Sequence, residues 1–237
     1  MNFLQNGIVA RLSESDQRLL LRRCKEVHLE VGDIIAAPGT SHDDVYFLTG
    51  ASIALVIRDE SRAGLAVGLI GHEGAVGLQF ALGLGAGVIT LQVQSAGTAW
   101  RVRGSSLQRL IARRSVLLLL FCRYMWSASQ DVAAMAACSQ IQDVKARFAA
   151  WVLLSAIRSN CLELLLTHAH VANMLGVRRA SVTLAAVELK AMGLLDYSRG
   201  RIHILDFARL KAVSCWTPAH TTIGRETMPP SHLPMAM

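Results

Sequence analysis

The sequence predicts an α+β protein in which a small antiparallel β-roll is followed by a long helix and a C-terminal winged helix-turn-helix. Three observations lead to this fold class. Short apolar runs separated by turn residues fill the first 104 residues, a heptad-spaced apolar pattern begins near residue 115, and two short helices joined at Gly176 precede a predicted β-hairpin. The corresponding parts are residues 1–113, 114–138 and 139–215, and the proline-rich residues 216–237 are expected to form a disordered tail.

The first part is expected to open with a short helix that Ser13 or Asp16 caps and that ends near Arg22 and Arg23. Strands of about five residues then recur every 8–12 residues or so, in runs such as VGDIIAAPGT, DDVYFLTGASIALVIRDE and GVITLQVQSAGTAWRV. This spacing is typical of a small antiparallel barrel or jelly roll. The glycine-rich GLGAG at residues 83–87 is interpreted as a β-turn, because it lacks the strand-then-helix context of a phosphate loop.

From about residue 115 the apolar residues recur at alternating steps of three and four, which predicts a helix of about 24 residues and ~36 Å. The seam consists of Leu118, Phe121, Met125, Ala128, Val132 and Met135. Two interpretations remain open: the helix packs on the core of its own chain, or it pairs with the same helix of a second copy. The length of the seam and its position between two unlike halves favour the second, so these residues are the candidate interface of a homodimer.

The rear part begins with an amphipathic helix expected over residues 141–158, with Ile141 on its apolar side, followed by a short strand in CLELLL. Thr167 should cap a helix over His168–Leu175, which Gly176 ends. A second helix is expected from about Arg178 to Met192. The segment LLDYSRGRIHILD then predicts a β-hairpin, and the order helix, turn, helix and hairpin is that of a winged helix-turn-helix.

The positive charge is concentrated in the rear part. Residues 1–104 carry 9 basic and 10 acidic side chains, residues 105–160 carry 7 and 2, and residues 161–237 carry 8 and 5. This asymmetry predicts an anionic partner, with double-stranded DNA as the first candidate. Arg178 and Arg179 stand in the first turn of the second helix, where the helix dipole disfavours cations. A nearby phosphate or guanine edge would explain them, and the alternative is a solvated basic helix end.

A family resemblance becomes visible in LTHAHVANMLGVRRASVTLAAVELKAMGLLDYSRGRIHILD. This segment closely resembles the DNA-binding domain of the Crp/Fnr superfamily of bacterial transcription regulators, particularly its rhizobial-type members. CSQIQDVKARFAAWVLL resembles the helix that precedes that domain, and VYFLTGASIALVI and GLIGHEGAVGL resemble the β-roll sensor domain, so the match covers roughly residues 4–215. The resemblance implies a cyclic-nucleotide-binding-like β-roll that senses an unknown signal, a dimerisation helix, and a recognition helix that enters the major groove of palindromic promoter DNA.

The residues expected to contact DNA are Thr167, Arg178, Arg179, Ser181, Thr183, Leu184, Arg199 and Arg201. Arg179 falls on the arginine with which the family contacts a base or the backbone. Ala180 and Leu184 replace the acidic and second arginine positions of the best-known members, so a different operator is expected. Leu184 and the Thr183 methyl are candidates to contact thymine methyl groups. Thr167 lacks the glutamate that often follows it by three positions, which predicts a weaker helix cap.

The β-roll is not expected to bind cyclic AMP tightly. Gly71-His72-Glu73-Gly74 resembles the start of the phosphate-binding motif of cyclic-nucleotide-binding relatives, but residues 63–100 contain no Lys or Arg. A buried phosphodiester without a facing cation would be poorly compensated. The chain is therefore assigned to the branch that does not bind cyclic AMP, with its effector unknown.

No catalytic residue, cofactor or metal site is expected, because no G-x-S-x-G or H-E-x-x-H motif occurs and the chain is not read as an enzyme. The five cysteines include no C-x-x-C pair, which predicts small apolar core residues with an occasional exposed thiol. The N-terminus lacks the features of a signal peptide, and the apolar run Val116–Cys122 is too short to span a bilayer.

The expected protein is therefore cytoplasmic, without a membrane partner, and RNA polymerase is a further candidate partner. A competing interpretation is a sensing or protein-interaction module whose DNA-binding activity has decayed. Ala180, Leu184 and the divergent tail favour this alternative, whereas the Arg178-Arg179 start and the Arg199-Gly200-Arg201 wing oppose it.

Overall fold

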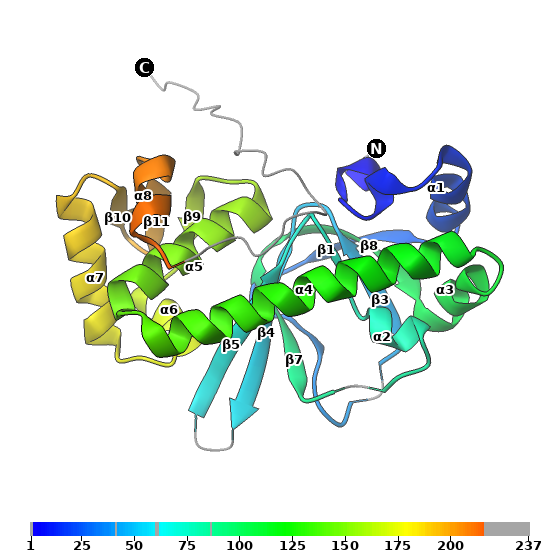
Figure 1. Ribbon diagram of the computed structural model, residues 1–237, viewed down its shortest axis with the longest axis horizontal. Coiled ribbons are helices and arrows are strands. Elements are labelled where there is room, and N and C mark those ends of the chain that lie inside the picture. The colour runs from blue at the N-terminus through cyan, green and yellow to red at the C-terminus, as the bar shows by residue number, and fades with distance from the viewer. Residues whose placement is uncertain (1, 41, 60–61, 86, 216–237) are drawn as a thin grey trace.

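A β-roll, a long helix along its side and a smaller helical domain at one end make up the computed structural model (Figure 1). The structure describes residues 2–40, 42–59, 62–85 and 87–215, and the expected tail at 216–237 lies outside them. The predicted fold class is confirmed, with the three parts in the expected order.

Two four-stranded antiparallel sheets form the β-roll and enclose its core. The chain enters through η1 (Asn2–Gln5), η2 (Val9–Arg11) and α1 (Glu14–Leu21), which Ser13 caps as expected by accepting the Asp16 N–H at 3.2 Å. One sheet has the order β1 (Lys25–Leu29), β8 (Gly97–Arg103), β3 (Asp44–Leu48), β6 (Ala75–Val76). The other has the order β2 (Ile34–Ala36), β7 (Ile89–Ser95), β4 (Ser52–Asp59), β5 (Arg62–Ile70).

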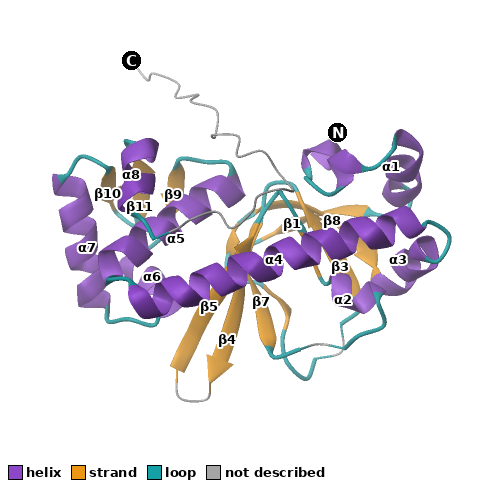
Figure 2. Ribbon diagram, in the orientation of Figure 1, coloured by secondary structure: helices purple, strands orange, loops and turns teal. Residues whose placement is uncertain are grey.

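The long helix α4 (Ser115–Ile141) follows the short helices α2 (Leu78–Ala81) and α3 (Gly104–Ile111) and lies along the β-roll (Figure 2). It extends beyond the predicted end at residue 138. The assignment of Ile141 to the following helix was wrong, because Ile141 is the last residue of α4 and is exposed. The helix ends there because Gln142 is extended and Asp143 caps the next helix through the Ala146 N–H at 2.8 Å.

The C-terminal domain contains α5 (Val144–Ser159), α6 (His168–Leu175), α7 (Arg179–Ala191), α8 (Phe207–Val213) and a three-stranded sheet. The hairpin strands β10 (Leu195–Ser198) and β11 (Arg201–Ile204) pair as predicted, and β9 (Glu163–Leu165) adds to the outer edge of β11. The sequence analysis missed α8. Its signal is Asp206, which caps the helix by accepting the Arg209 N–H at 2.9 Å.

The β-roll and the C-terminal domain share a hydrophobic core. Ala54, Val56, Ala66 and Leu69, all from the β4–β5 ribbon, belong to the same buried cluster as Phe148 and Trp151 of α5. The C-terminal domain therefore uses the β-roll as one wall of its core rather than hanging from a free linker.

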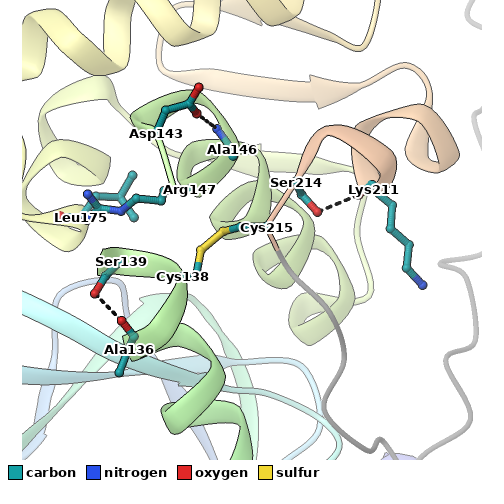
Figure 3. Close-up of a disulfide and its surroundings, with 10 residues drawn as sticks. All are labelled: Ala136, Cys138, Ser139, Asp143, Ala146, Arg147, Leu175, Lys211, Ser214 and Cys215. Atoms are coloured by element: carbon teal, nitrogen blue, oxygen red, sulfur yellow. Dashed lines mark hydrogen bonds between the residues drawn. A yellow bond between two sulfur atoms is a disulfide. The ribbon is translucent and has the colours of Figure 1, made fainter. Parts of the chain in front are cut away.

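The cysteines depart from the sequence-based expectation. Cys138 and Cys215 form a disulfide with their Cα atoms 5.9 Å apart, at the ends of α4 and α8 (Figure 3). Burial raises the pKa of Cys24 to about 12, and Cys122 and Cys161 are exposed free thiols. The pair was not predicted because 77 positions separate the two residues, and the ends of α4 and α8 meet only when the C-terminal domain is folded.

Candidate nucleic-acid interface

The helices α6 and α7 pack against each other as a helix-turn-helix. Thr167 caps α6 by accepting the His170 N–H at 3.1 Å, so the cap forms even without the glutamate of a capping box. Gly176 ends α6 with a φ of 65°, a left-handed conformation that favours glycine. The chain then turns through Val177 and Arg178 into α7, which positions the second helix across the first.

The two faces of α7 are separated as the sequence predicts. Val182, Ala186 and Leu189 are buried in the domain core. On the opposite side Arg179, Ala180, Leu184 and Val187 are exposed, and Leu184 keeps 65% of its surface. Leu184 and Val187 therefore belong to the solvent-exposed face of α7 and not to the domain core.

The N-terminus of α7 carries exposed positive charge from two adjacent arginines. Arg178 occupies the N-cap position, and no side chain caps the helix. Within the part of the chain that the structure describes, neither Arg178 nor Arg179 forms an ion pair. The unpaired backbone N–H groups and the two guanidinium groups therefore stand together at one helix end, and this arrangement favours an anion.

The side chains of Thr183 and Ser181 are less exposed than expected. The Thr183 hydroxyl donates to the Arg179 carbonyl at 3.1 Å and contacts His168 Nδ1 at 3.0 Å. The His168 ring stacks on Tyr197 of the hairpin, with ring centroids 4.0 Å apart. Burial, followed by the charge of Arg179, lowers the pKa of His168. The hydroxyl of Thr183 therefore connects α7 to α6, and Ser181 is half-buried beside it.

The hairpin carries two arginines that differ in their contacts with the rest of the domain. Arg199 and Gly200 form its two-residue turn with positive φ values of 48° and 80°, and Arg199 is exposed. Arg201 pairs with Glu163 of β9 at 2.6 Å. Because β9 brings a carboxylate next to it, Arg201 is paired, whereas Arg199 forms no ion pair among the described residues; the DNA contacts of both arginines stay predictions.

Comparison with known proteins gives one family match, to the Crp-like helix-turn-helix domain over residues 146–213. The chain thus has a Crp-like helix-turn-helix domain on a Crp/Fnr fold. A protein assigned to the Crp/Fnr family from Eubacterium rectale is 18% identical and superposes with a TM-score of 0.67, over 88% of this chain and 98% of its own. A Crp/Fnr family transcriptional regulator from Thermus thermophilus is 21% identical, with a TM-score of 0.64 over 80% and 98%.

FixK2 from Bradyrhizobium japonicum is 13% identical, with a TM-score of 0.64 over 81% of this chain and 97% of its own. These likenesses establish the Crp/Fnr fold, and the rhizobial-type assignment stays a prediction. No curated protein is similar enough in sequence to count as a match.

Within this Crp/Fnr fold, the predicted apolar seam of α4 lies mostly toward the chain's own β-roll. Phe121 is only 1% exposed and packs near Phe47, with ring centroids 6.2 Å apart. Ala128, Val132 and Met135 are half-buried, and only Leu118 and Met125 at the edge of the seam are exposed. The assignment of Phe121 to a dimer interface is therefore wrong, because its ring fills the β-roll core.

The opposite side of α4 is apolar and exposed. This outer face consists of Leu119, Cys122, Trp126, Ala133 and Ala137. Trp126 leaves 70% of its surface uncovered. The sequence analysis did not separate the two faces, because α4 is apolar nearly all around its first half and a heptad pattern can be drawn on either side.

Arg158 is a buried charged residue that the sequence analysis missed. It comes from α5 of the Crp-like domain, is only 4% exposed, and reaches Glu73 of the β-roll at 3.2 Å and Asp131 of α4 at 2.9 Å. Its carbonyl also accepts the His72 N–H at 3.3 Å. The sequence carries no clear signal for it, because α5 also carries Lys145 and Arg147 and the partners of Arg158 lie in segments far away along the chain.

This cluster changes the reasoning about cyclic AMP. Residues 63–100 lack a cation, but Arg158 supplies one from α5 and is already paired with two carboxylates. The cavity beside it measures about 30 Å³, which is the size of one water molecule. The expectation of no tight cyclic AMP binding therefore stays a prediction. Its support is now the small volume of this cavity and the pairing of Arg158 with two carboxylates, and no longer the absence of a cation.

Among the described residues, no three His, Cys, Asp or Glu side chains lie close enough together to hold a metal ion. Nor does any helix in that part of the chain have the length and apolar character needed to cross a membrane. The similar structures are described as transcriptional regulators, and the absence of enzymatic activity stays a prediction.

Proposed function

We propose that this protein is a transcription regulator that binds promoter DNA as a homodimer, with its β-roll sensing a signal of unknown identity. The supporting observation is the N-terminus of α7, where an uncapped helix end and two arginines that pair with no carboxylate among the described residues stand on the exposed face of a helix-turn-helix. A phosphate or the O6 and N7 atoms of guanine would accept hydrogen bonds from the backbone N–H groups of this helix end and from the two guanidinium groups.

The DNA contacts are proposed as follows. Arg178 and Arg179 contact DNA at the start of α7, and Ser181, Thr183 and Leu184 line the face that follows. Arg199 contacts the backbone from the hairpin turn, and Thr167 lies at the start of α6. Arg201 contributes less because Glu163 already neutralises it.

For the homodimer we propose the outer face of α4, centred on Trp126, as the interface. Two α4 helices paired there would bury exposed aromatic and aliphatic surface and leave each β-roll contact intact. The two recognition helices would then read half-sites about one helical turn apart, roughly 34 Å, in an imperfect palindrome. A cytoplasmic location and a contact with RNA polymerase belong to the same proposal.

The test is fluorescence anisotropy with an operator selected from random duplexes and with a scrambled duplex of equal length. Arg179→Ala should weaken binding to the selected operator by about 1–3 kcal/mol and relax the preference at one base pair if Arg179 reads a guanine. Arg22→Ala is a matched control, since it removes the same charge from an exposed position at the end of α1, on the far side of the molecule (Figure 1).

A salt series separates specific from non-specific contacts. Arg199→Ala should weaken binding to both duplexes alike and reduce the salt slope by about one unit. If the parent protein binds both duplexes equally, or neither, the regulator proposal fails and the sensing or protein-interaction module takes its place. Loss of affinity in Arg22→Ala as large as in Arg179→Ala would also contradict the assigned interface.

A further inference from the structure

The disulfide between Cys138 and Cys215 ties the Crp-like domain to α4 at a single point. Cys138 lies in the last turn of α4, and Cys215 lies just after α8. Their Cα separation of 5.9 Å lies in the usual range for a disulfide. The bond closes a segment that contains the whole helix-turn-helix domain at residues 146–213.

The backbone link between α4 and α5 beside this disulfide is short. Gln142 and Asp143 are the only residues between α4 and α5, and Gln142 is extended. Cys215 reaches the start of α5, where its N–H donates to the Ala146 carbonyl at 3.4 Å. At the other end, α5 is held by Arg158 and by Ser155, which accepts from Gln94 of β7 at 2.8 Å. The disulfide therefore adds a covalent tie at the end of α5 that lies far from these polar contacts with the β-roll.

Cys138 and Cys215 are partly exposed, and they border an apolar cavity of about 320 Å³ between α4, α5 and β5, with Trp151 and Leu65 on its walls. A protein that acts on promoter DNA, as proposed above, works where cellular thiols normally keep cysteines reduced. Disulfides that do form in such a compartment are usually redox-sensing or catalytic.

We propose that Cys138 and Cys215 are a reversible oxidative modification site that controls how firmly the DNA-binding domain is held against α4. The proposed oxidant class is a low-molecular-weight disulfide. The thiolate of one cysteine attacks a sulfur of the oxidant and releases one thiol, and the second cysteine then displaces the other half as a thiol. One oxidant disulfide is reduced to two thiols for each protein disulfide formed, and a dithiol reverses the reaction.

The consequence for DNA binding rests on the proposed function. In the oxidised arrangement α7 lies on the outside of the molecule with its arginine-bearing end exposed (Figure 1). Opening the disulfide removes the covalent tie at the start of α5, so the junction at Gln142 and Asp143 gains mobility while the core shared with the β4–β5 ribbon stays packed, and part of the ordering must then be supplied during binding. The oxidised protein should therefore bind its operator roughly fivefold or more tightly than the reduced protein.

The first test needs no DNA. The full chain is equilibrated with glutathione disulfide or with dithiothreitol, then denatured, alkylated and analysed by peptide mass, since the half-buried Cys24 thiol, with its raised pKa, would react poorly in the folded protein. Reduction should expose all five thiols, and oxidation should leave three and yield a Cys138–Cys215 peptide. Amide exchange near Gln142 should be roughly fivefold slower in the oxidised form. Cys138→Ser should match the reduced parent under both conditions, whereas Cys161→Ser, an exposed thiol outside the pair, should respond like the parent.

The second test compares operator affinity of the same samples. Equal affinity of the oxidised and reduced parent overturns the control of DNA binding, and absence of the Cys138–Cys215 peptide or unchanged exchange near Gln142 overturns the modification site itself. If neither form binds any duplex, the transcription-regulator proposal is the one that fails, and the peptide and exchange data still decide the modification site.

Discussion

Removing Arg158 should destabilise the whole molecule, because this side chain joins three elements from inside the core. Arg158→Met keeps the length and most of the packing volume of the side chain but leaves Glu73 and Asp131 facing each other without a cation. Breaking a buried ion pair by removing one partner costs about 3–5 kcal/mol. The side chains of Glu73 and Asp131 are 17% and 27% exposed, so solvent screening places the expected loss near the lower end.

A loss of about 3 kcal/mol corresponds to a decrease in Tm of roughly 6–12 °C for a chain of this size. Two variants isolate the cause. Asp131→Asn keeps an acceptor for Arg158, and because burial raises the pKa of Asp131 in spite of the nearby guanidinium, removing its charge should change stability by less than about 1 kcal/mol. Combining Arg158→Met with Glu73→Gln and Asp131→Asn should restore most of the lost stability, since no unpaired charge remains.

Urea unfolding followed by far-UV circular dichroism measures these differences in the free energy of unfolding. Repeating it at several pH values tests the direction in which the stability of Arg158→Met changes with pH. Burial raises the pKa of Asp131 and the Arg158 guanidinium opposes this shift, so without Arg158 the Asp131 carboxyl holds its proton to higher pH in the folded state than in the unfolded state. The folded state then binds more protons, so the stability of Arg158→Met should rise as the pH falls from 7 toward about 4. A loss below about 1 kcal/mol in Arg158→Met, or no recovery in the triple variant, would refute this account of the cluster.

Three further outcomes are expected. Trp126→Asp should convert a dimer of twice 25.7 kDa into a monomer in sedimentation at micromolar concentration. Met125→Asp should have a smaller effect because Met125 lies at the edge of the outer face. A monomeric parent would contradict the interface. Thr167→Ala should cost about 1 kcal/mol in thermal unfolding, and an unchanged Tm would mean that the cap of α6 contributes nothing. Because burial and Arg179 lower the pKa of His168, the unfolded state binds more protons than the folded state near pH 6. The stability contributed by neutral His168 should therefore be lost as the pH falls below about 6.5. His168→Gln should lessen that pH dependence in the same unfolding assay.

The local elements could be predicted from the sequence because their signals are short-range. Ser13, Thr167 and Gly176 act within one helical turn, and the alternation of buried and exposed residues on α7 depends on the helical period alone. Arg179 could likewise be identified from its position at a helix start.

Features that depend on segments far apart could not be predicted in the same way. Arg158 meets Glu73 across 85 positions of the chain, and Arg201 meets Glu163 only because β9 joins the hairpin. The predicted dimer seam included Phe121, a residue of the β-roll core, since the periodicity gives the spacing of a face but not its partner. Phe121 became a core residue when the β-roll packed against that side of the helix.

The core shared between the β4–β5 ribbon and the C-terminal domain has a consequence for how this protein can be divided. Residues 146–213 match a domain family as a unit, yet Ala54, Val56, Ala66 and Leu69 of the β-roll cover part of that unit's apolar interior. Expressed alone, the fragment would present this surface to water and tend to self-associate. In the intact chain, the same surface couples the melting of the two parts, so that heating should give one calorimetric transition instead of two.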